Sequence, residues 1–309
     1  MNKMAFLNRV CPGCSENTRQ ESVKPPVSAM DSEWDAISKG WSGLYNQRMF
    51  FPYCRCDGCG MLYNPTYFNA DQLDELYRSM APNMAEAVDP AILQQTQKGY
   101  VDLVAQELQG DGGYLEIGPD IGTFAVACSD VTVFSHYWFV EPNEAVWSSL
   151  HAAFPGQATS IESSLSSIEK IPDRSLKLAV AIHVLDHIID PLDTLRLISR
   201  KLANGGIFLA VTHDERSMLA RVLGKNWPAY CLQHPHLFNT KTIAQMFTQA
   251  DYRLVGVRKT SNVFPAGFLV RQGVWAGLGK KIPPLGVLEN LNLKLRLGNI
   301  AAVARYVEA

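Results

Sequence analysis

The pattern of apolar and polar residues after residue 110 indicates short strands that alternate with helices. Apolar runs typical of buried strands occur at 114–117, 131–140, 176–182, 207–212 and 252–258. Helical patterns occur between them at 123–129, 190–202 and 241–250. This alternation predicts an α/β fold with a doubly wound sheet, which binds its ligands at the carboxyl ends of the strands.

The N-terminal third of the chain follows a different pattern. Aromatic residues with little helical periodicity fill the region between residues 34 and 53, as in short strands. A helix is predicted at 69–80, where Leu73 and Tyr77 share one face, and a longer helix is predicted at 89–109. Helical segments therefore connect the N-terminal region to the predicted sheet.

Four of the seven cysteines form two pairs, Cys11 with Cys14 and Cys56 with Cys59, each with two intervening residues. Two such turns together supply the four thiolates of a tetrahedral zinc site. All seven histidines lie well after these cysteines, so we expect a closed, structural Zn²⁺ site with cysteine ligands alone. The alternatives are two disulfides, which need an oxidising compartment, and a single redox-active pair, which would not explain the second pair. Cys54 is expected to be a spare thiol.

These patterns divide the chain into four parts. They are a zinc-ribbon domain at 1–66, a helical connector at 67–110, a Rossmann-like domain at 111–260 and a C-terminal helical tail at 261–309. The Leu-rich stretch 285–297 in the tail is expected to be a helix that docks on the core or on a second subunit in a homodimer. Its flanking basic residues also allow attraction to an anionic surface.

Composition and charge narrow the classes of function. The 309 residues are 47% hydrophobic, enough for a sizeable core, and no apolar run is long enough to cross a bilayer, so we expect a cytoplasmic protein. The net charge of −2 excludes a globally basic nucleic-acid binder. Residues 1–66 hold seven basic and six acidic residues, so no basic stripe marks a nucleic-acid partner there.

The turn after the first strand indicates which cofactor the sheet binds. A dinucleotide-binding turn has a second glycine at the position that Asp120 occupies here, between Gly118 and Gly122. A carboxylate at this position would repel pyrophosphate. S-adenosylmethionine carries no phosphate and presents an ammonium and a sulfonium, which Asp120 and Glu116 would attract. Glu141 ends the second strand, where it suits the two ribose hydroxyls; otherwise it is a solvated loop carboxylate.

Three segments resemble class I S-adenosylmethionine-dependent methyltransferases: LEIGPDIGTFA, VEPN and AIHVLDHIIDPLDTLRLISRKLANGGIFLAVT. They are similar to the glycine loop, the acidic ribose loop and the fourth and fifth strands of that family. Two flanking segments, YCRCDGCGMLYNPTYFNADQLDELY and LGKNWPAYCLQHPHLFNTKTIAQMFTQADYRLV, resemble the zinc-ribbon branch that modifies sugars and saccharides. The sequence departs from the family pattern at Asp120, which replaces a glycine, and at Gln233, which replaces an acidic residue.

The resemblance also implies roles for residues after the third and fourth strands. His183 would lie along the methionine part of S-adenosylmethionine, and Ser164 would follow the third strand near the adenine. Asp186 and His187 would face the same cleft from the following turn. Histidine has a pKa suited to removing a proton near neutral pH, and His187 is our second candidate for that base.

The first candidate for the base is His234. It lies in a loop with Tyr230, Gln233 and His236, a polar and aromatic group that could cover a sugar. Each of these histidines is equally compatible with a purely structural role, in which its nitrogens bond to neighbouring groups.

The sequence therefore predicts methyl transfer to a hydroxyl of a saccharide or sugar-containing metabolite. The alternatives are C- or N-methylation of a nucleotide-linked sugar, methylation of RNA, and cofactor binding without turnover, because the fold alone does not define the acceptor.

Overall fold

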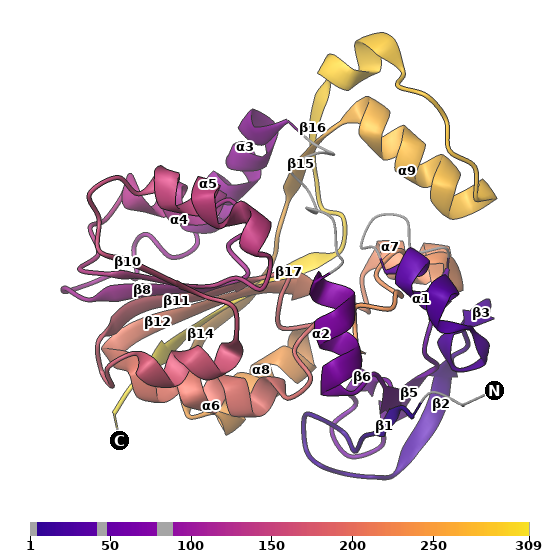
Figure 1. Cartoon of the computed structure of the whole chain (residues 1–309), viewed down its shortest axis with the longest axis horizontal. Coiled ribbons are helices and arrows are strands. Elements are labelled where there is room, and N and C mark those ends of the chain that lie inside the picture. The colour runs from indigo at the N-terminus through magenta and orange to yellow at the C-terminus, as the bar shows by residue number, and fades with distance from the viewer. Residues whose placement is uncertain (1–4, 42–47, 79–88, 309) are drawn as a thin grey trace.

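A central sheet of seven strands organises the computed structural model, which describes residues 5–41, 48–78 and 89–308 (Figure 1). The strands follow the order β10 (Thr159–Glu162), β9 (Tyr137–Val140), β8 (Gly113–Ile117), β11 (Leu176–Ile182), β12 (Leu202–His213), β17 (Asn299–Tyr306) and β14 (Tyr252–Lys259). The first five are parallel, and β17 is antiparallel to both of its neighbours. The predicted α/β fold class is confirmed.

Helices cover both faces of this sheet (Figure 1). One face holds α3 (Pro90–Val101), α4 (Thr123–Ser129) and α5 (Trp147–Ala153). The other holds α6 (Pro191–Lys201), α8 (Thr240–Gln249) and the 3₁₀ helix η3 (Leu165–Lys170). Because both faces are covered, the central strands are apolar on both sides, which explains the continuous apolar runs in the sequence.

The strand and helix boundaries around the first turn match the prediction closely. β8 extends the predicted strand by one residue, α4 has the predicted bounds, and β11 has the predicted bounds as well. The predicted strand at 131–140 is wrong in its first half, because β9 comprises only Tyr137–Val140. The long helix predicted at 89–109 is α3, which begins after its Asp89 cap and ends at Val101.

The N-terminal region contains several short strands. β2 (Arg19–Val23), β5 (Tyr53–Cys56) and β6 (Leu62–Tyr63) form an antiparallel sheet, and β1 (Leu7–Asn8) pairs with β7 (Thr66–Tyr67). β3 (Val27–Ser28) pairs in parallel with β4 (Met49–Phe50). The 3₁₀ helix η1 (Ala29–Asp31) directly follows β3. Two helices belong to this region as well, α1 (Trp34–Gly40), which was not predicted, and α2 (Ala70–Arg78).

The N-terminal region is joined to the rest of the molecule through backbone pairing. β13 (His236–Leu237), which follows the main sheet's fifth strand in sequence, pairs with β6. Cys11, Cys56 and Tyr63 also belong to the same buried cluster as β11 and β12. The predicted helix at 69–80 corresponds to α2, and its residues 79 and 80 lie outside the described residues.

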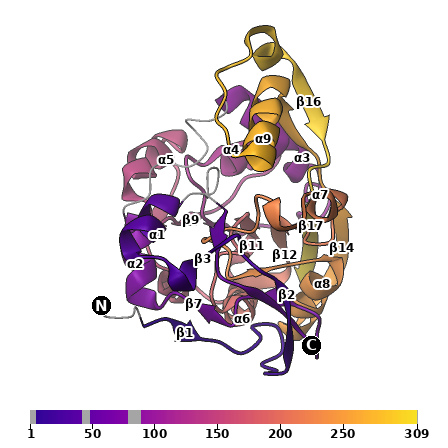
Figure 2. The ribbon, with the colours of Figure 1, turned by 90° about the vertical axis from the view of Figure 1, so that its right-hand side faces the viewer.

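The segment after residue 260, predicted to be a helical tail, contains strands as well as helices. β15 (Asn262–Pro265), α9 (Ala266–Leu278), η5 (Gly286–Asn290) and β16 (Asn292–Leu295) form an arm, which Figure 2 shows at the top of the molecule. The stretch 285–297 is not one continuous helix: its first half forms the short 3₁₀ helix η5, and its second half alternates polar and apolar residues and pairs with β15. The chain then returns as β17 and inserts into the main sheet between β12 and β14.

Among residues 5–41, 48–78 and 89–308, none of the helices has the length and apolar content needed to cross a bilayer.

Candidate functional site

The turn between β8 and α4 requires glycine at two places. Gly118 and Gly122 have φ angles of 68° and 79°. A Cβ atom at Gly118 would lie 2.6 Å from Val184, and one at Gly122 would lie 2.7 Å from Leu150. Asp120, between them, also has a left-handed φ of 52°, which aspartate tolerates better than most residues. The turn therefore keeps its tight path without the middle glycine.

Three carboxyl groups surround this turn. Glu116 is buried and accepts a hydrogen bond of 2.5 Å from the Tyr114 hydroxyl, and burial raises the pKa of Glu116 to about 8. Glu141, at the end of β9, accepts hydrogen bonds from the backbone N–H groups of Asp120 at 3.0 Å and Asn143 at 2.8 Å. Burial also raises the pKa of Glu141 and of Asp120. A cationic guest would favour the ionised form of all three groups.

A cluster of four histidines and one aspartate lies where β11 and β12 end. We refer to His183, Asp186, His187, His213 and His234 as the His–Asp cluster. Asp186 is fully buried, and its Oδ2 lies 2.6 Å from Nδ1 of His213. The His213 ring centroid is 4.9 Å from those of His183 and His234, and Nε2 of His234 is 3.1 Å from Nε2 of His187.

The charges within the His–Asp cluster are complementary. Burial raises the pKa of Asp186, but His213 and His234 outweigh this and hold it well below its usual range. Burial lowers the pKa of His234, but Cys231, Asp186 and hydrogen bonding outweigh this and raise it to about 10. Burial lowers the pKa of His183 and of His187 to about 3. Near neutral pH, Asp186 is therefore a carboxylate and His234 holds a proton.

Hydrogen bonds orient the rings of His234 and His187. Nδ1 of His234 donates to the carbonyl of Ala229 at 2.7 Å, so the second proton of this imidazolium lies on Nε2 and faces His187. The other nitrogen of His187 lies 3.3 Å from the hydroxyl of Tyr77, which α2 brings to the site. A chain of hydrogen bonds therefore links His234, His187 and Tyr77.

Comparison with known proteins identifies the family. A family model described as "Methyltransferase domain" matches residues 92–257, which is more than half of the chain. The chain belongs to this family. It is a methyltransferase that uses S-adenosylmethionine, as the sequence resemblance predicted. A search of proteins with curated functions found no match.

Solved structures similar to this methyltransferase have low sequence identity to it. A methyltransferase-type protein of Bacillus halodurans C-125 is 14% identical with a TM-score of 0.50, over 68% of this chain and 99% of the other. A Thermotoga maritima protein described as a possible histamine N-methyltransferase is 17% identical, with a TM-score of 0.45 over 70% of this chain and 90% of the other. A Haloferax volcanii complex of the Trm112 methyltransferase activator with a methyltransferase is 12% identical. Its TM-score is 0.49, over 71% of this chain and 94% of the other.

The four cysteines of the two pairs meet in the methyltransferase as predicted. Their sulfur atoms all lie within 4.8 Å of one another, with Sγ–Sγ distances of 3.5 Å for Cys11 with Cys59 and for Cys14 with Cys56. A tetrahedral zinc site with Zn–S bonds of about 2.3 Å has sulfur atoms about 3.8 Å apart. The backbone N–H of Gly13 also donates to Cys11 Sγ at 3.4 Å, which stabilises a thiolate there.

Four other predicted site residues have structural contacts. His236 is fully buried and its Nε2 bonds to the carbonyl of Leu185 at 2.9 Å. The Tyr230 ring packs against the rings of Phe50 and Tyr53, with centroids 5.6 and 5.3 Å apart. Gln233 is buried in the same loop. Ser164 caps η3 by accepting from the N–H of Ser166, and its side chain is exposed. The contacts of His236 and Tyr230 hold the loop that carries His234. His236 also lies close enough to Asp186 and His234 for their charges to affect its pKa.

Sequence analysis missed His213, Tyr77 and Asn299 as site residues. His213 ends β12, so the rule that ligands bind at the carboxyl ends of strands could have found it. Tyr77 was assigned only to the buried face of a helix. Asn299 lies 3.5 Å from Nε2 of His183, but it begins β17, a strand that the sequence pattern did not reveal.

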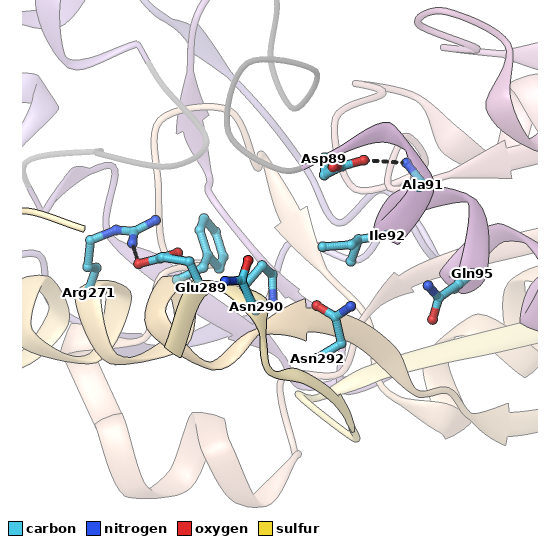
Figure 3. Close-up of a pocket in the computed structure, with 10 residues that line it drawn as sticks. Asp89, Ala91, Ile92, Gln95, Arg271, Glu289, Asn290 and Asn292 are labelled. Atoms are coloured by element: carbon cyan, nitrogen blue, oxygen red, sulfur yellow. Dashed lines mark hydrogen bonds and ion pairs between the residues drawn. The ribbon is translucent and has the colours of Figure 1, made fainter. Parts of the chain in front are cut away.

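A separate pocket of about 420 Å³ lies between α3 and the arm (Figure 3). Asp89, Ile92 and Gln95 line it from α3, and Arg271 and Glu289 line it from the arm. Arg271 and Glu289 form an ion pair across η5 and α9. No residue of the His–Asp cluster lines this pocket, so it is not part of the histidine site.

Proposed function

We propose that the protein transfers a methyl group from S-adenosylmethionine to a hydroxyl of a saccharide or sugar-containing metabolite. The observation that carries the proposal is the position of the His–Asp cluster. It lies at the carboxyl ends of β11 and β12, beside the glycine turn that follows β8. Val184, next to His183, contacts the space above Gly118, so the two parts of the site are adjacent. A group that accepts protons thus lies next to the donor site.

The residues around the glycine turn fit a cationic donor. S-adenosylmethionine supplies a methyl group on a positively charged sulfur that is open to direct displacement. Gly118, Asp120 and Gly122 would hold it against the backbone, and Glu116 would favour its positive charge. Glu141 would accept the ribose hydroxyls with the lone pairs that its two backbone contacts leave available. Ser164 would lie near the adenine and His183 near the methionine.

The pair of His234 and His187 would accept the proton of the acceptor hydroxyl. His234 holds the rings in line, because its Nδ1 is bound to Ala229 and its Nε2 faces His187. His234 would release its own proton to solvent before it accepts another, and Tyr77 would hold the far nitrogen of His187 in place. Methyl transfer is then an in-line displacement in which alignment supplies much of the rate.

The loop that holds His234 would form the acceptor side of the cleft. Asp186 would orient the acceptor hydroxyl through the histidines, and Tyr230, Gln233 and His236 would shape the loop around it. The loop continues into β13, which pairs with β6, so the N-terminal region would hold the acceptor loop in place. We propose that Cys11, Cys14, Cys56 and Cys59 bind a structural Zn²⁺ that stabilises this region.

The proposal is tested by measuring donor binding and methyl transfer separately. Calorimetry should detect S-adenosylmethionine binding to the wild-type protein and to His234→Ala. The wild type should transfer a radiolabelled methyl group to members of a panel of nucleotide sugars and saccharides, and His234→Ala should not. The control is His151→Ala, which changes an exposed residue of α5 and should be as active as the wild type. Full transfer activity in His234→Ala would show that His234 is not the base. Transfer to RNA but to no saccharide would contradict the proposed acceptor.

A further inference from the structure

Two buried atoms of the His–Asp cluster have no hydrogen-bond partner among the residues that the structure describes. They are Oδ1 of Asp186 and Nδ1 of His183. Asp186 has no exposed surface, so leaving one of its oxygens unpaired in the interior has a substantial cost. His183 has a left-handed φ of 53°, a backbone conformation that costs energy in a residue other than glycine and often occurs at functional sites.

The same two residues lie within reach of one common ligand. His183, Asp186 and His213 each offer one donor atom, and these atoms all lie within 4.8 Å of one another. Nδ1 of His213 and Oδ2 of Asp186 are 2.6 Å apart. Ligand atoms that share a metal ion at about 2.0–2.2 Å lie about 3 Å apart, so small side-chain rotations would bring the three atoms into coordination distance.

We propose that His183, Asp186 and His213 bind a divalent transition-metal ion in the cleft of the methyltransferase. Two imidazoles and one carboxylate are a donor set that suits zinc, iron(II), cobalt(II) or manganese(II) and leaves coordination positions open. The Asn299 amide lies 3.5 Å from Nε2 of His183, and Nδ1 of the same ring is the nitrogen without a partner in the described residues, so it is the one available to an ion.

The exposure of the three residues fits a site that is open to a substrate. Asp186 is fully buried, whereas the side chain of His213 is 25% exposed and His183 is half-buried. Such a site differs from the cysteine site, where four ligands would leave no open position. The ion would take the acceptor hydroxyl as a further ligand and lower its pKa, and the released proton would go to the His234 pair. This role of the ion rests on the proposed function, but the binding of the ion does not.

The experiment is a titration of the zinc-loaded full-length protein with Co²⁺, followed by visible absorption and by metal analysis. The protein is first brought to one zinc ion per chain, which the cysteine site holds more tightly. The wild type and His151→Ala should then each bind one cobalt ion without displacing this zinc, and the spectrum should lack the strong bands of cobalt bound to thiolate. His213→Ala and the nearly isosteric Asp186→Asn should bind it at least tenfold more weakly. Circular dichroism checks that each variant is folded.

Two results would overturn the metal site. One is a wild-type protein that takes up no cobalt beyond exchange at the cysteine site, a result that needs no variant. The other is unchanged cobalt affinity in folded His213→Ala. Donor binding in the presence of a chelator separates this proposal from the proposed function. If S-adenosylmethionine binds and methyl transfer continues at full rate without the ion, only the catalytic role of the ion fails. If S-adenosylmethionine does not bind at all, the proposed function fails.

Discussion

Arg55 of β5 forms two hydrogen bonds with the carboxylate of Glu215, which follows β12 of the main sheet. The two distances are 3.1 and 3.0 Å, and Asn239 donates a third hydrogen bond of 2.7 Å to the same carboxylate. The Glu215 side chain is only 3% exposed. This contact links the N-terminal region to the end of β12, where His213 lies. The position of His213 therefore depends on the folding of the N-terminal region.

Removal of this contact is expected to destabilise the whole molecule. Arg55→Ala leaves a buried carboxylate with fewer donors, and because the Arg55 side chain is 30% exposed, solvent screens part of the loss. We expect the free energy of unfolding to fall by about 1–3 kcal/mol. Urea denaturation measures this value. Lys39→Ala, which removes an exposed ion pair with Asp35, is the control and should change stability by less than about 0.5 kcal/mol. Equal losses in both variants would contradict the coupling.

The cysteine site should hold one zinc ion per chain, and its removal should loosen the N-terminal region. Cys14→Ser changes the exposed member of the four ligands, so it removes metal binding with little change in packing. We expect zinc content to fall to near zero in the cysteine site and the melting temperature to decrease. Elemental analysis and calorimetry measure both. Cys54→Ser, which alters the cysteine outside the group of four, should keep its zinc. Loss of zinc in Cys54→Ser would show that the ligand set is different.

The raised pKa of Glu116 predicts how stability changes with pH. The group has a pKa of about 8 in the folded protein and about 4.3 when unfolded, so folding takes up a proton between these values. The stabilising contribution is therefore complete at low pH and is lost as pH rises toward 8. Glu116→Gln should match the wild type near pH 4 and exceed its stability by about 1–4 kcal/mol near pH 8. Denaturation curves between about pH 4 and pH 8 measure this difference in stability. The control is Glu144→Gln, which changes an exposed residue and should differ from the wild type by the same amount at every pH.

The sequence predicted the parts of the fold in which local pattern and local structure agree. The turn from β8 to α4 is an example, because Gly118 and Gly122 have backbone conformations that only glycine adopts easily. The two cysteine pairs are another, since two short turns constrain all four sulfur atoms. His183 and His187 also follow β11 directly, so the predicted strand was enough to place both at its carboxyl end.

The missed features depend on contacts between distant segments. β17 is a strand because it completes the sheet between β12 and β14, and nothing in residues 299–306 alone indicates that position. Its Asn299 therefore could not be placed beside His183. In 292–295, strand pairing with β15 overrode the Leu-rich composition that favoured a helix. His234 was predicted to lie in a loop with Tyr230, Gln233 and His236, but its contact with His187, its bond to Ala229 and its raised pKa follow only from the folded loop.

Asp120 separates the effect of charge from the effect of backbone conformation in the donor site. Asp120→Gly relieves a left-handed φ and should stabilise the free protein by about 0.5–1 kcal/mol, while it removes a carboxylate near the proposed cationic donor. Asp120→Asn keeps a side chain that tolerates the same conformation and removes only the charge. If the charge matters, both variants should bind S-adenosylmethionine several-fold more weakly in calorimetry, with a smaller loss at high salt. If only the turn matters, Asp120→Asn should bind like the wild type, and Asp120 would have no electrostatic role toward the donor.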